Sequence, residues 1–298
     1  MKPFLPMFHA LPPPSDQELS RVRQAADLKV SLLIPARNSG HALEATAVEA
    51  HRYLSQHFGS SFEIILIPNS HTGQSADSSL AVAQTLAARF SQIQICTHLG
   101  PVGKGAALRS GFLMSRGEII FFTDADLPYE LRFFEEAAEL LGAGYDFVTG
   151  NRRLSSSHFN IPVKLLPLAY GRHRMGLAFN AAVRLLIPLK TSDTQAGIKA
   201  LSRRFACEAF QHLSCPGFFF DLELFLVQQA GGYRHRELPV TLFLNSEKST
   251  VKIFRDLFLA GYWLTRITVR NLLGKYRAAI QAPTLLENLD RTESEVSS

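Results

Sequence analysis

The chain has 298 residues, of which 46% are hydrophobic and 19% charged, and its net charge is +5. This composition is typical of a globular protein, and the length allows one large α/β domain or two smaller ones. An uncharged apolar run of about 18 residues is missing, which excludes a chain integral to a bilayer but not one that lies on it.

The first predicted element is a loose N-terminal arm, residues 1–28. Five prolines precede Ser15, and they disfavour both a helix and the apolar core of a signal peptide. From 29 to 150, short apolar runs alternate with helix-like segments, which predicts a mostly parallel sheet covered by helices. The predicted strands are 30–35, 63–68, 93–97, 118–123 and 145–149, and the predicted helices are 41–57, 75–90, 104–115 and 130–142.

After residue 150 the pattern becomes richer in helix. The predicted elements are a basic helical stretch at 160–189, a short segment at 191–199, a helix near 203–213, a segment at 218–231, a strand around 237–244 and a helix at 250–276. We expect one main domain at 29–249 and an amphipathic, membrane- or core-facing segment at 250–280. The acidic, serine-rich tail at 281–298 lacks a periodic apolar face and is predicted to be disordered.

Two carboxylates, Asp124 and Asp126, follow the predicted strand 118–123. In an extended chain they point to the same side, so they repel each other unless a proton or a cation lies between them. The spacing suits chelation of one Mg²⁺ or Mn²⁺, which usually takes substrate phosphates as further ligands. Ligands also bind at the carboxyl ends of parallel strands. The alternative is a solvated junction, where Asp is common because it favours turns.

A glycine-flanked lysine, Lys104, begins a predicted helix within the stretch GPVGKGAALRSG. The spacing fails the tests for a Walker A loop and for a dinucleotide-binding fingerprint, because His98, Gly105 and Leu108 stand at required positions. Free N–H groups at the helix start would still favour a phosphate. An ordinary loop before a helix is the alternative.

Basic residues gather in the second half of the chain, which predicts an anionic partner or, as the alternative, a solvated basic face. They are Arg152, Arg153, Lys164, Arg172, His173, Arg174, Arg184, Lys190, Arg203, Arg204, Arg234 and Arg236. No recognised nucleic-acid motif accompanies them, so no nucleic acid is expected. Three separated cysteines without metal-ligand spacing indicate buried or free thiols in a reducing compartment.

The order of several motifs carries a resemblance. They are VSLLIPARN, FEIILIPNS, GKGAALRSGF, the D-A-D of 124–126, DFVTGNRR, SDTQAGIKALSR, FFFDLEL and ELPV. Together, over about residues 30–251, the chain resembles an inverting family 2 glycosyltransferase, and more narrowly the dolichyl-phosphate (polyprenyl-phosphate) glucosyl- and mannosyltransferases. The resemblance implies a GT-A type fold: an α/β, Rossmann-like, mostly parallel sheet flanked by helices, with C-terminal amphipathic helices.

The resemblance also implies roles for individual residues. It places Asp124 and Asp126 at the metal and the donor diphosphate. The other positions that it places at the nucleotide are Pro35, Arg37, Asn69 and Lys104. The positions that it places at the reaction centre, together with Asp126, are Arg152, Arg172, Asp193, Gln195, Asp221 and Glu223.

This chain departs from the family pattern on the nucleotide side. It has P-A-R-N-S at 35–39 where P-x-Y-N-E is usual, and P-N-S-H at 68–71 where D-D-G-S is usual. Pro128 and the K-S-T of 248–250 replace a glutamine and a G-S-K. The nucleotide base is therefore left open, and a degenerate nucleotide-sugar-binding or scaffold protein is one alternative.

The implied reaction moves a hexose from a UDP- or GDP-hexose to a polyprenyl phosphate with inversion. A phosphate monoester is largely dianionic at pH 7, so a divalent cation and arginines matter more than a strong base. A different acceptor, a glycolipid or polysaccharide, is the other alternative. The lipid acceptor implies a protein peripheral on the cytoplasmic face of a membrane, bound through 250–276 or through a membrane-anchoring partner protein.

Overall fold

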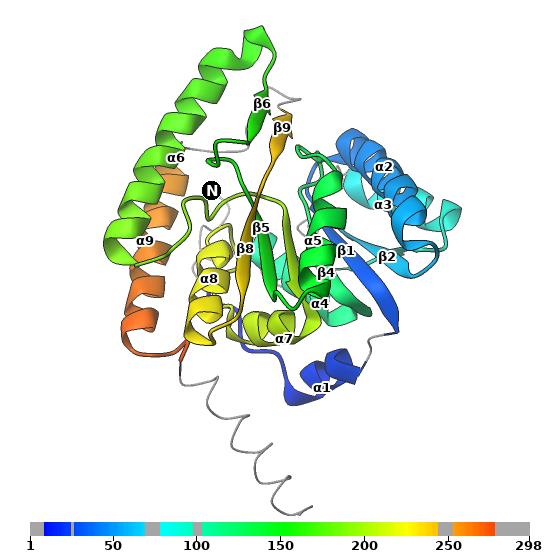
Figure 1. Cartoon of the computed structure of the whole chain (residues 1–298), viewed down its shortest axis with the longest axis horizontal. Coiled ribbons are helices and arrows are strands. Elements are labelled where there is room, and N and C mark those ends of the chain that lie inside the picture. Colours follow the sequence, from blue (N-terminus) through cyan, green and yellow to red (C-terminus); the bar gives the residue numbers. More distant parts are fainter. Residues whose placement is uncertain (1–8, 25–26, 69–77, 98–102, 244–252, 278–298) are drawn as a thin grey trace, which may run out of the picture.

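The computed structural model describes residues 9–24, 27–68, 78–97, 103–243 and 253–277, with only part of the side chains of 166–186 and none of those of 253–258. A seven-stranded sheet in the order β3-β2-β1-β4-β7-β5-β8 forms its centre (Figure 1). The strands are β1 Leu28–Ala36, β2 Phe62–Pro68, β3 Ile93–Ile95, β4 Gly117–Phe122, β5 Phe147–Asn151, β7 Lys199–Ser202 and β8 His235–Pro239. All neighbours pair parallel except β7, which is antiparallel to both β4 and β5.

Helices cover both faces of this sheet. Alternate strand residues point to opposite faces, so Phe121 joins one core cluster and Phe122 the other. The Phe121 cluster includes residues of α2 Gly40–Phe58, α3 Ser78–Arg89 and α5 Arg132–Gly142. The Phe122 cluster includes residues of α4 Lys104–Met114, α7 Arg203–His212, α8 Phe220–Ala230 and α9 Ile253–Leu272.

The remaining elements extend this core. A second, two-stranded parallel sheet joins β6 His158–Asn160 to β9 Thr241–Phe243. A short 3-10 turn, η2 Val163–Leu165, leads into the long helix α6 Leu166–Leu186. In Figure 1, α6 and α9 lie along the same side of the molecule. In the part of the chain that the structure describes, no helix is long and apolar enough to cross a membrane.

The predicted alternation of strands and helices over 29–150 is confirmed, with boundaries shifted by a few residues. The prediction of a loose arm over 1–28 is wrong for its second half, because Asp16–Gln24 forms helix α1. Leu19 and Val22 of α1 are buried, and the buried guanidinium of Arg203 donates to the Val22 carbonyl at 2.8 Å. The predicted disordered tail lies outside the described residues.

Helix α9 confirms the predicted helix at the C-terminal end, and its described residues favour the core-facing alternative for one face. Leu259, Trp263 and Ile267 are buried in the Phe122 cluster. The other side is not covered, since Val269 and Leu272 are exposed. The segment is therefore amphipathic, as the sequence predicts, with its apolar stripe already packed.

Candidate active site

The candidate site lies at the edge of the sheet where β4 and β5 end. Asp124 follows β4, and Arg152 follows β5. Because β7 runs antiparallel between them, its beginning meets the same edge, and the segment 191–198 leads directly into the site. Residues that are distant in sequence are thus brought together by one reversed strand.

Lys104 and Asp124 form an ion pair at this edge. The Lys104 ammonium lies 2.5 Å from Asp124 Oδ1. Burial alone would lower the pKa of Lys104, but the carboxylates of Asp124 and Asp221 raise it above its ordinary value. The other Asp124 oxygen lies against Gly197, where an added Cβ would stand only 1.9 Å from Oδ2. The carboxylate is therefore held from two sides.

Arg152 and Asp193 form a bidentate pair. Arg152 donates from Nε and from Nη2 to the two carboxylate oxygens, both at 2.8 Å, and its backbone N–H adds a third bond at 3.0 Å. Asp193 is fully buried, and burial would raise its pKa, but Arg152 holds that pKa below the ordinary value. Arg152 keeps 31% of its side chain exposed. Its remaining donors can meet an incoming anion.

The site contains a second lysine and a second acid, Lys199 and Asp221, which pair with each other. The ammonium of Lys199 lies 2.8 Å from Asp221 Oδ1, and both side chains are buried. Burial lowers the pKa of Lys199 and raises that of Asp221. The two lysines share the ring of Phe122, with Lys199 Nζ 5.5 Å and Lys104 Nζ 5.9 Å from its centroid. The site thus holds two lysine–carboxylate pairs, and the ammonium groups of both pairs lie near one aromatic ring.

The loop that follows Asp126 is fixed by the smaller sheet. Leu127 has a φ of 37°, a left-handed conformation that is uncommon for leucine. The Pro128 carbonyl accepts a bond from Phe243 at 2.8 Å, and Tyr129 forms a bridge with Leu242. The buried Tyr129 hydroxyl accepts a bond from the Gly197 N–H at 3.1 Å. The loop is therefore tied to β9 and to the segment before β7.

The carboxylates of Asp124 and Asp126 fit a hard divalent cation. Both side chains reach solvent, since Asp126 is exposed and Asp124 keeps 36% of its side chain exposed. No group of three or more His, Cys, Asp or Glu side chains that could hold a metal occurs within the described residues. The two carboxylates would thus leave most ligand positions to water and phosphate, as is usual for Mg²⁺.

The other predicted site residues are placed as follows. Pro35 is partly buried in β1, and Arg37 is exposed just beyond it. Gln195 donates its backbone N–H to Asp193 Oδ1 at 3.2 Å. Asn69 and the Arg172 side chain lie outside the described residues.

Glu223 is fully buried, and its carboxylate accepts hydrogen bonds from Ser214, Cys215 and Tyr276. Lys199, Tyr129 and Gly197 were not predicted as site residues. The sequence held a signal for two of them, because Gly197 and Lys199 stand in the motif SDTQAGIKALSR.

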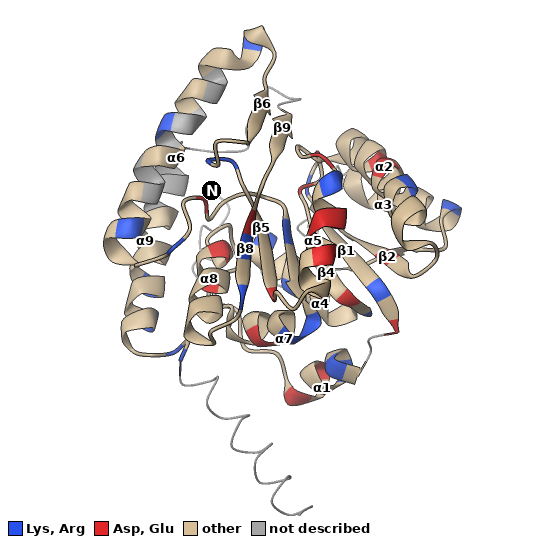
Figure 2. Ribbon diagram, in the orientation of Figure 1, with Lys and Arg blue, Asp and Glu red and all other residues tan. Residues whose placement is uncertain are grey.

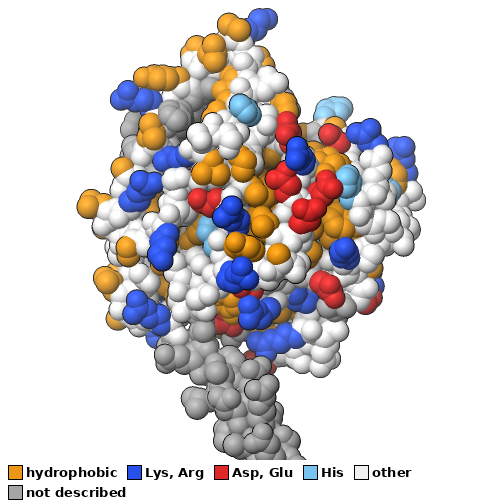
Figure 3. Space-filling model, viewed as in Figure 1, with side chains coloured by type: hydrophobic (Ala, Val, Ile, Leu, Met, Phe, Trp, Pro, Cys, Tyr) orange, Lys and Arg blue, Asp and Glu red, His pale blue; other side chains and the backbone are white. Residues whose placement is uncertain are grey.

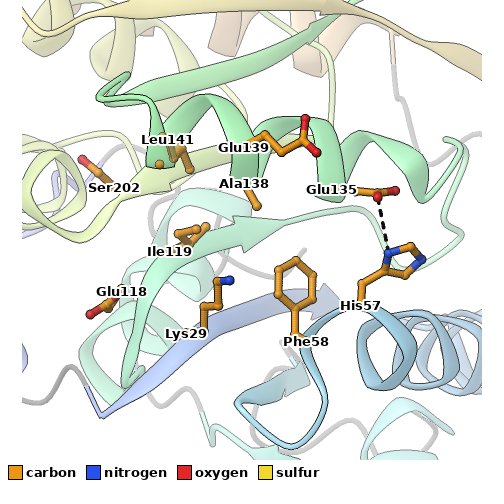
Figure 4. Close-up of a pocket in the computed structure, with 11 residues that line it drawn as sticks. Lys29, His57, Phe58, Glu118, Ile119, Glu135, Ala138, Glu139, Leu141 and Ser202 are labelled. Atoms are coloured by element: carbon orange, nitrogen blue, oxygen red, sulfur yellow. Dashed lines mark ion pairs between the residues drawn. The ribbon is translucent and has the colours of Figure 1, made fainter.

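A separate pocket of about 570 Å³ opens at the opposite edge of the sheet (Figure 4). Lys29 and Glu118 line it from the beginnings of β1 and β4, and Ser202 from the end of the reversed β7. His57 and Glu135 form an ion pair of 3.6 Å at its rim. It does not touch the candidate active site.

Comparison with known proteins gives the chain's relatives. Residues 31–206 match the family model described as "Glycosyl transferase family 2". The chain is 29% identical over 272 residues to glycosyltransferase AglD of Haloferax volcanii, which covers 88% of this chain but only 41% of AglD. It is 23% identical over 262 residues to the dolichyl-phosphate beta-glucosyltransferase of Saccharomyces cerevisiae, covering 84% of this chain and 77% of that protein.

Solved structures share the fold. Glucosyl-3-phosphoglycerate synthase from Mycobacterium tuberculosis, in complex with phosphoglyceric acid, superposes with a TM-score of 0.56 at 17% identity, over 86% of this chain and 85% of that one. The same enzyme with Mn²⁺, UDP and glucosyl-3-phosphoglycerate gives a TM-score of 0.53 at 18% identity, over 88% of this chain and 85% of that one. Mannosyl-3-phosphoglycerate synthase from Rubrobacter xylanophilus gives 0.52 at 20% identity, over 90% and 80%.

Proposed function

The chain belongs to glycosyl transferase family 2 and has a GT-A fold, and on that premise we propose that it transfers a hexose from a nucleoside-diphosphate sugar to a polyprenyl phosphate with inversion. The observation that carries the proposal is the meeting of Lys104–Asp124 and Arg152–Asp193 at one sheet edge. Cationic donors and acidic metal ligands there suit a reaction between two phosphate-bearing substrates.

The donor diphosphate is assigned to the Lys104–Asp124 side. Asp124 and Asp126 would hold Mg²⁺ or Mn²⁺, which would neutralise charge on the leaving diphosphate. Lys104 begins α4, and its ammonium can pass from Asp124 Oδ1 to a phosphate oxygen as the donor binds. Arg37, exposed after β1, is placed on the nucleoside side.

The acceptor phosphate is assigned to Arg152 and its neighbours. An oxygen of the phosphate forms the new bond to the anomeric carbon, while the bond from that carbon to the donor diphosphate breaks and the diphosphate leaves. Arg152 is held by Asp193, so its fork is oriented before the substrate arrives. Arg153 ties this edge to α6 by donating to the Gly176 carbonyl at 3.3 Å. Similarity to the dolichyl-phosphate beta-glucosyltransferase of yeast supports a lipid phosphate as acceptor.

Contact with a membrane is assigned to η2 and α6. Exposed apolar side chains along them are Val163, Leu166, Tyr170, Leu177, Leu185 and Leu186. The described charged side chains of α6 are basic (Figure 2), and Figure 3 shows hydrophobic and basic side chains side by side along this edge. Such a surface suits the headgroup region of an anionic bilayer. We place the protein at the cytoplasmic face, bound directly or with a membrane-anchoring partner.

A second candidate function is nucleotide-sugar binding without transfer. It is favoured by the 2.5 Å ion pair, because Lys104 already neutralises one of the two carboxylates that a metal would need. A transferase with a glycolipid or polysaccharide acceptor remains the alternative within the same chemistry.

The test is an activity and binding panel on the purified full chain. UDP-glucose, UDP-galactose and GDP-mannose are each incubated with a short polyprenyl phosphate, with Mn²⁺ or with a chelator, and the lipid-linked sugar is measured. We expect one donor to be transferred in a metal-dependent way. Donor binding without transfer to any acceptor would support the binding protein, and no binding at all would overturn the proposal.

A further inference from the structure

The buried carboxylate of Glu223 connects the C-terminal part of the chain to the loop 213–217. Glu223 is fully buried in α8. Its Oε2 accepts the backbone N–H groups of Ser214 and Cys215 at 2.9 and 2.7 Å. Its Oε1 accepts the hydroxyls of Ser214 and Tyr276, both at 2.7 Å. With four bonds, the carboxylate has no room for a substrate and acts as a structural acceptor.

The loop 213–217 in turn holds the beginning of α4. The Ala106 N–H donates to the Pro216 carbonyl at 3.0 Å, and the described residues supply no side-chain cap to this helix start. An added Cβ on Gly103 would stand 2.0 Å from the Pro216 oxygen, and one on Gly105 2.6 Å from the Cys215 oxygen. The loop therefore touches the backbone on both sides of Lys104.

We propose that Tyr276 is a positioning residue for the donor-phosphate site, acting through Glu223 and the loop 213–217 on the helix start that carries Lys104. The inference rests on the proposed function, because it takes Lys104 as a ligand of the donor diphosphate. It deepens that function by giving the C-terminal segment after α9 a part in donor binding.

Several contacts make Tyr276 a fixed link. Its side chain is fully buried, and burial next to Glu223 raises the pKa of its phenol, so the hydroxyl stays protonated and donates. Arg270 adds contacts to the same cluster, with Nε 3.9 Å from Glu223 Oε1 and Nη2 3.4 Å from the His212 carbonyl. Removing the hydroxyl leaves an acceptor oxygen of a buried carboxylate with one bond fewer. The loop backbone is then less firmly held.

The test compares Tyr276→Phe with wild type in calorimetric titrations of UDP and of GDP in the presence of Mn²⁺, at a temperature where both proteins are folded. We expect about three- to tenfold weaker binding of whichever diphosphate wild type binds. The matched control is Tyr53→Phe, which removes a bond from another tyrosine to a carboxylate, Glu135, at 3.3 Å in the α2–α5 region. Its affinity should equal that of wild type.

A double-mutant cycle separates positioning from general stability. In a Lys104→Met background, the further change Tyr276→Phe should have no effect on diphosphate affinity, because the group that it positions is gone. A merely structural role would lower the melting temperature and leave affinity unchanged in both backgrounds. If Tyr276→Phe does not fold, Ser214→Ala, which removes the other hydroxyl from Glu223 Oε1, takes its place with the same outcomes.

The outcomes distinguish this inference from the function on which it rests. Wild-type binding of a diphosphate with unchanged affinity in Tyr276→Phe overturns the inference alone. An equal loss of affinity in both Lys104 backgrounds also overturns it. Failure of wild type to bind either diphosphate with Mn²⁺ overturns the proposed function, and the inference with it.

Discussion

Lys104 and Arg152 both pair with a carboxylate, but the geometry of the two pairs differs. Each cation meets one carboxylate at the sheet edge, but Lys104 makes a single contact with a half-open Asp124, whereas Arg152 makes a bidentate contact with a buried Asp193. A lysine on a flexible stem can change partners when a ligand arrives, while a bidentate arginine stays oriented. The two sides of the site are therefore suited to a moving and a fixed charge.

Gly197 tests the placement of Asp124. Gly197→Ala should weaken metal-dependent donor binding by about tenfold or more. The new Cβ would stand 1.9 Å from Asp124 Oδ2, so the carboxylate would have to move away. The control is Gly142→Ala, where a Cβ meets nothing within 4 Å. Titration of Mn²⁺ in the presence of UDP and of GDP measures the effect, and equal affinities in the two variants would contradict it.

Arg152 is expected to matter for stability as well as for transfer. Arg152→Ala leaves the buried Asp193 unpaired and should lower the free energy of unfolding by about 3 kcal/mol while abolishing transfer; Arg152→Lys should lie between. Urea unfolding and initial transfer rates measure both effects.

The control for Arg152 is Arg204, which pairs with a buried aspartate, Asp146, but is itself mostly exposed. Arg204 is 72% exposed and lies 2.6 Å from Asp146. Without Arg204, Asp146 still accepts the Arg234 N–H at 3.0 Å and the Ser202 hydroxyl at 3.3 Å. Arg204→Ala should therefore cost about 1 kcal/mol and leave transfer unchanged. Comparable losses in the Arg152→Ala and Arg204→Ala variants would mean that the buried pair has no special role.

At the scale of elements, β7 decides the shape of the site. It is a four-residue strand, and its reversed direction places the DTQ segment between the ends of β4 and β5. Arg153 and the bond to Gly176 then connect this edge to α6. The site is thus a product of topology more than of any single loop.

Much of this arrangement could be predicted from sequence, for physical reasons that differ by element. Strands β1, β2 and β4 are buried on both faces and appear as continuous apolar runs, and Asp124 follows one of them directly. Strand β7 is too short to show a period, and its direction depends on pairing partners that lie 50 to 83 residues away in the chain. The buried Lys199–Asp221 pair could not be predicted, because only tertiary structure brings these charges together.

Helix α1 gives a test at the same scale. Leu19 is 3% exposed, so Leu19→Ala should lower the free energy of unfolding by about 2 kcal/mol through lost burial and a residual cavity. Gln17→Ala, on the exposed side of α1, should change it by less than about 0.5 kcal/mol. Chemical unfolding of both variants measures this, and an unaffected Leu19→Ala would show that α1 does not contribute to the core in solution.

At the scale of the whole molecule, exposed apolar and basic side chains gather along η2 and α6. Helices α2, α3 and α5 pack on the Phe121 face, whereas α9 packs on the Phe122 face. Helix α6 keeps exposed apolar side chains, and the hydrogen bond from Arg153 to the Gly176 carbonyl joins it to the candidate site. A lipid phosphate at a bilayer surface could reach Arg152 from the side of α6.

Membrane contact can be tested by reversing charge. Lys164→Glu with Arg184→Glu should weaken sedimentation with anionic liposomes by tenfold or more at low salt, since each basic residue near the surface contributes about 1 kcal/mol. Arg52→Glu with Arg132→Glu, on the α2 and α5 side, carries the same charge change as a control. Equal sedimentation of the two double variants would remove α6 as the contact.

His235 sets an acid limit on stability. Burial lowers the pKa of His235 to about 4, and Lys199 adds to this, whereas the unfolded value is near 6.5. Below pH 6.5 the unfolded state therefore takes up a proton that the folded state refuses, so stability falls as pH drops from about 6.5 to 4. The loss should reach roughly 3 kcal/mol at the lower end.

Urea unfolding at several pH values measures this dependence. His235→Gln keeps a group that can bond Thr149, which now lies 2.9 Å from His235 Nε2, but it cannot titrate. The variant should show a flatter profile between pH 6.5 and 4. An identical slope in wild type and variant would assign the acid sensitivity to other groups.

The docking of α1 has a consequence for synthesis of the protein on the ribosome. The Val22 carbonyl bonds Arg203, 181 residues further along the chain, and the Leu11 N–H bonds the Ser214 carbonyl. At about 5–20 residues per second, these partners are made roughly 10 to 40 s after the helix itself. During that interval Leu19 and Val22 lack the cover that α7 supplies in the folded protein. Helix α1 therefore leaves the ribosome well before the α7 residues that complete its docking, and nascent chains stalled before residue 203 would present it to chaperones.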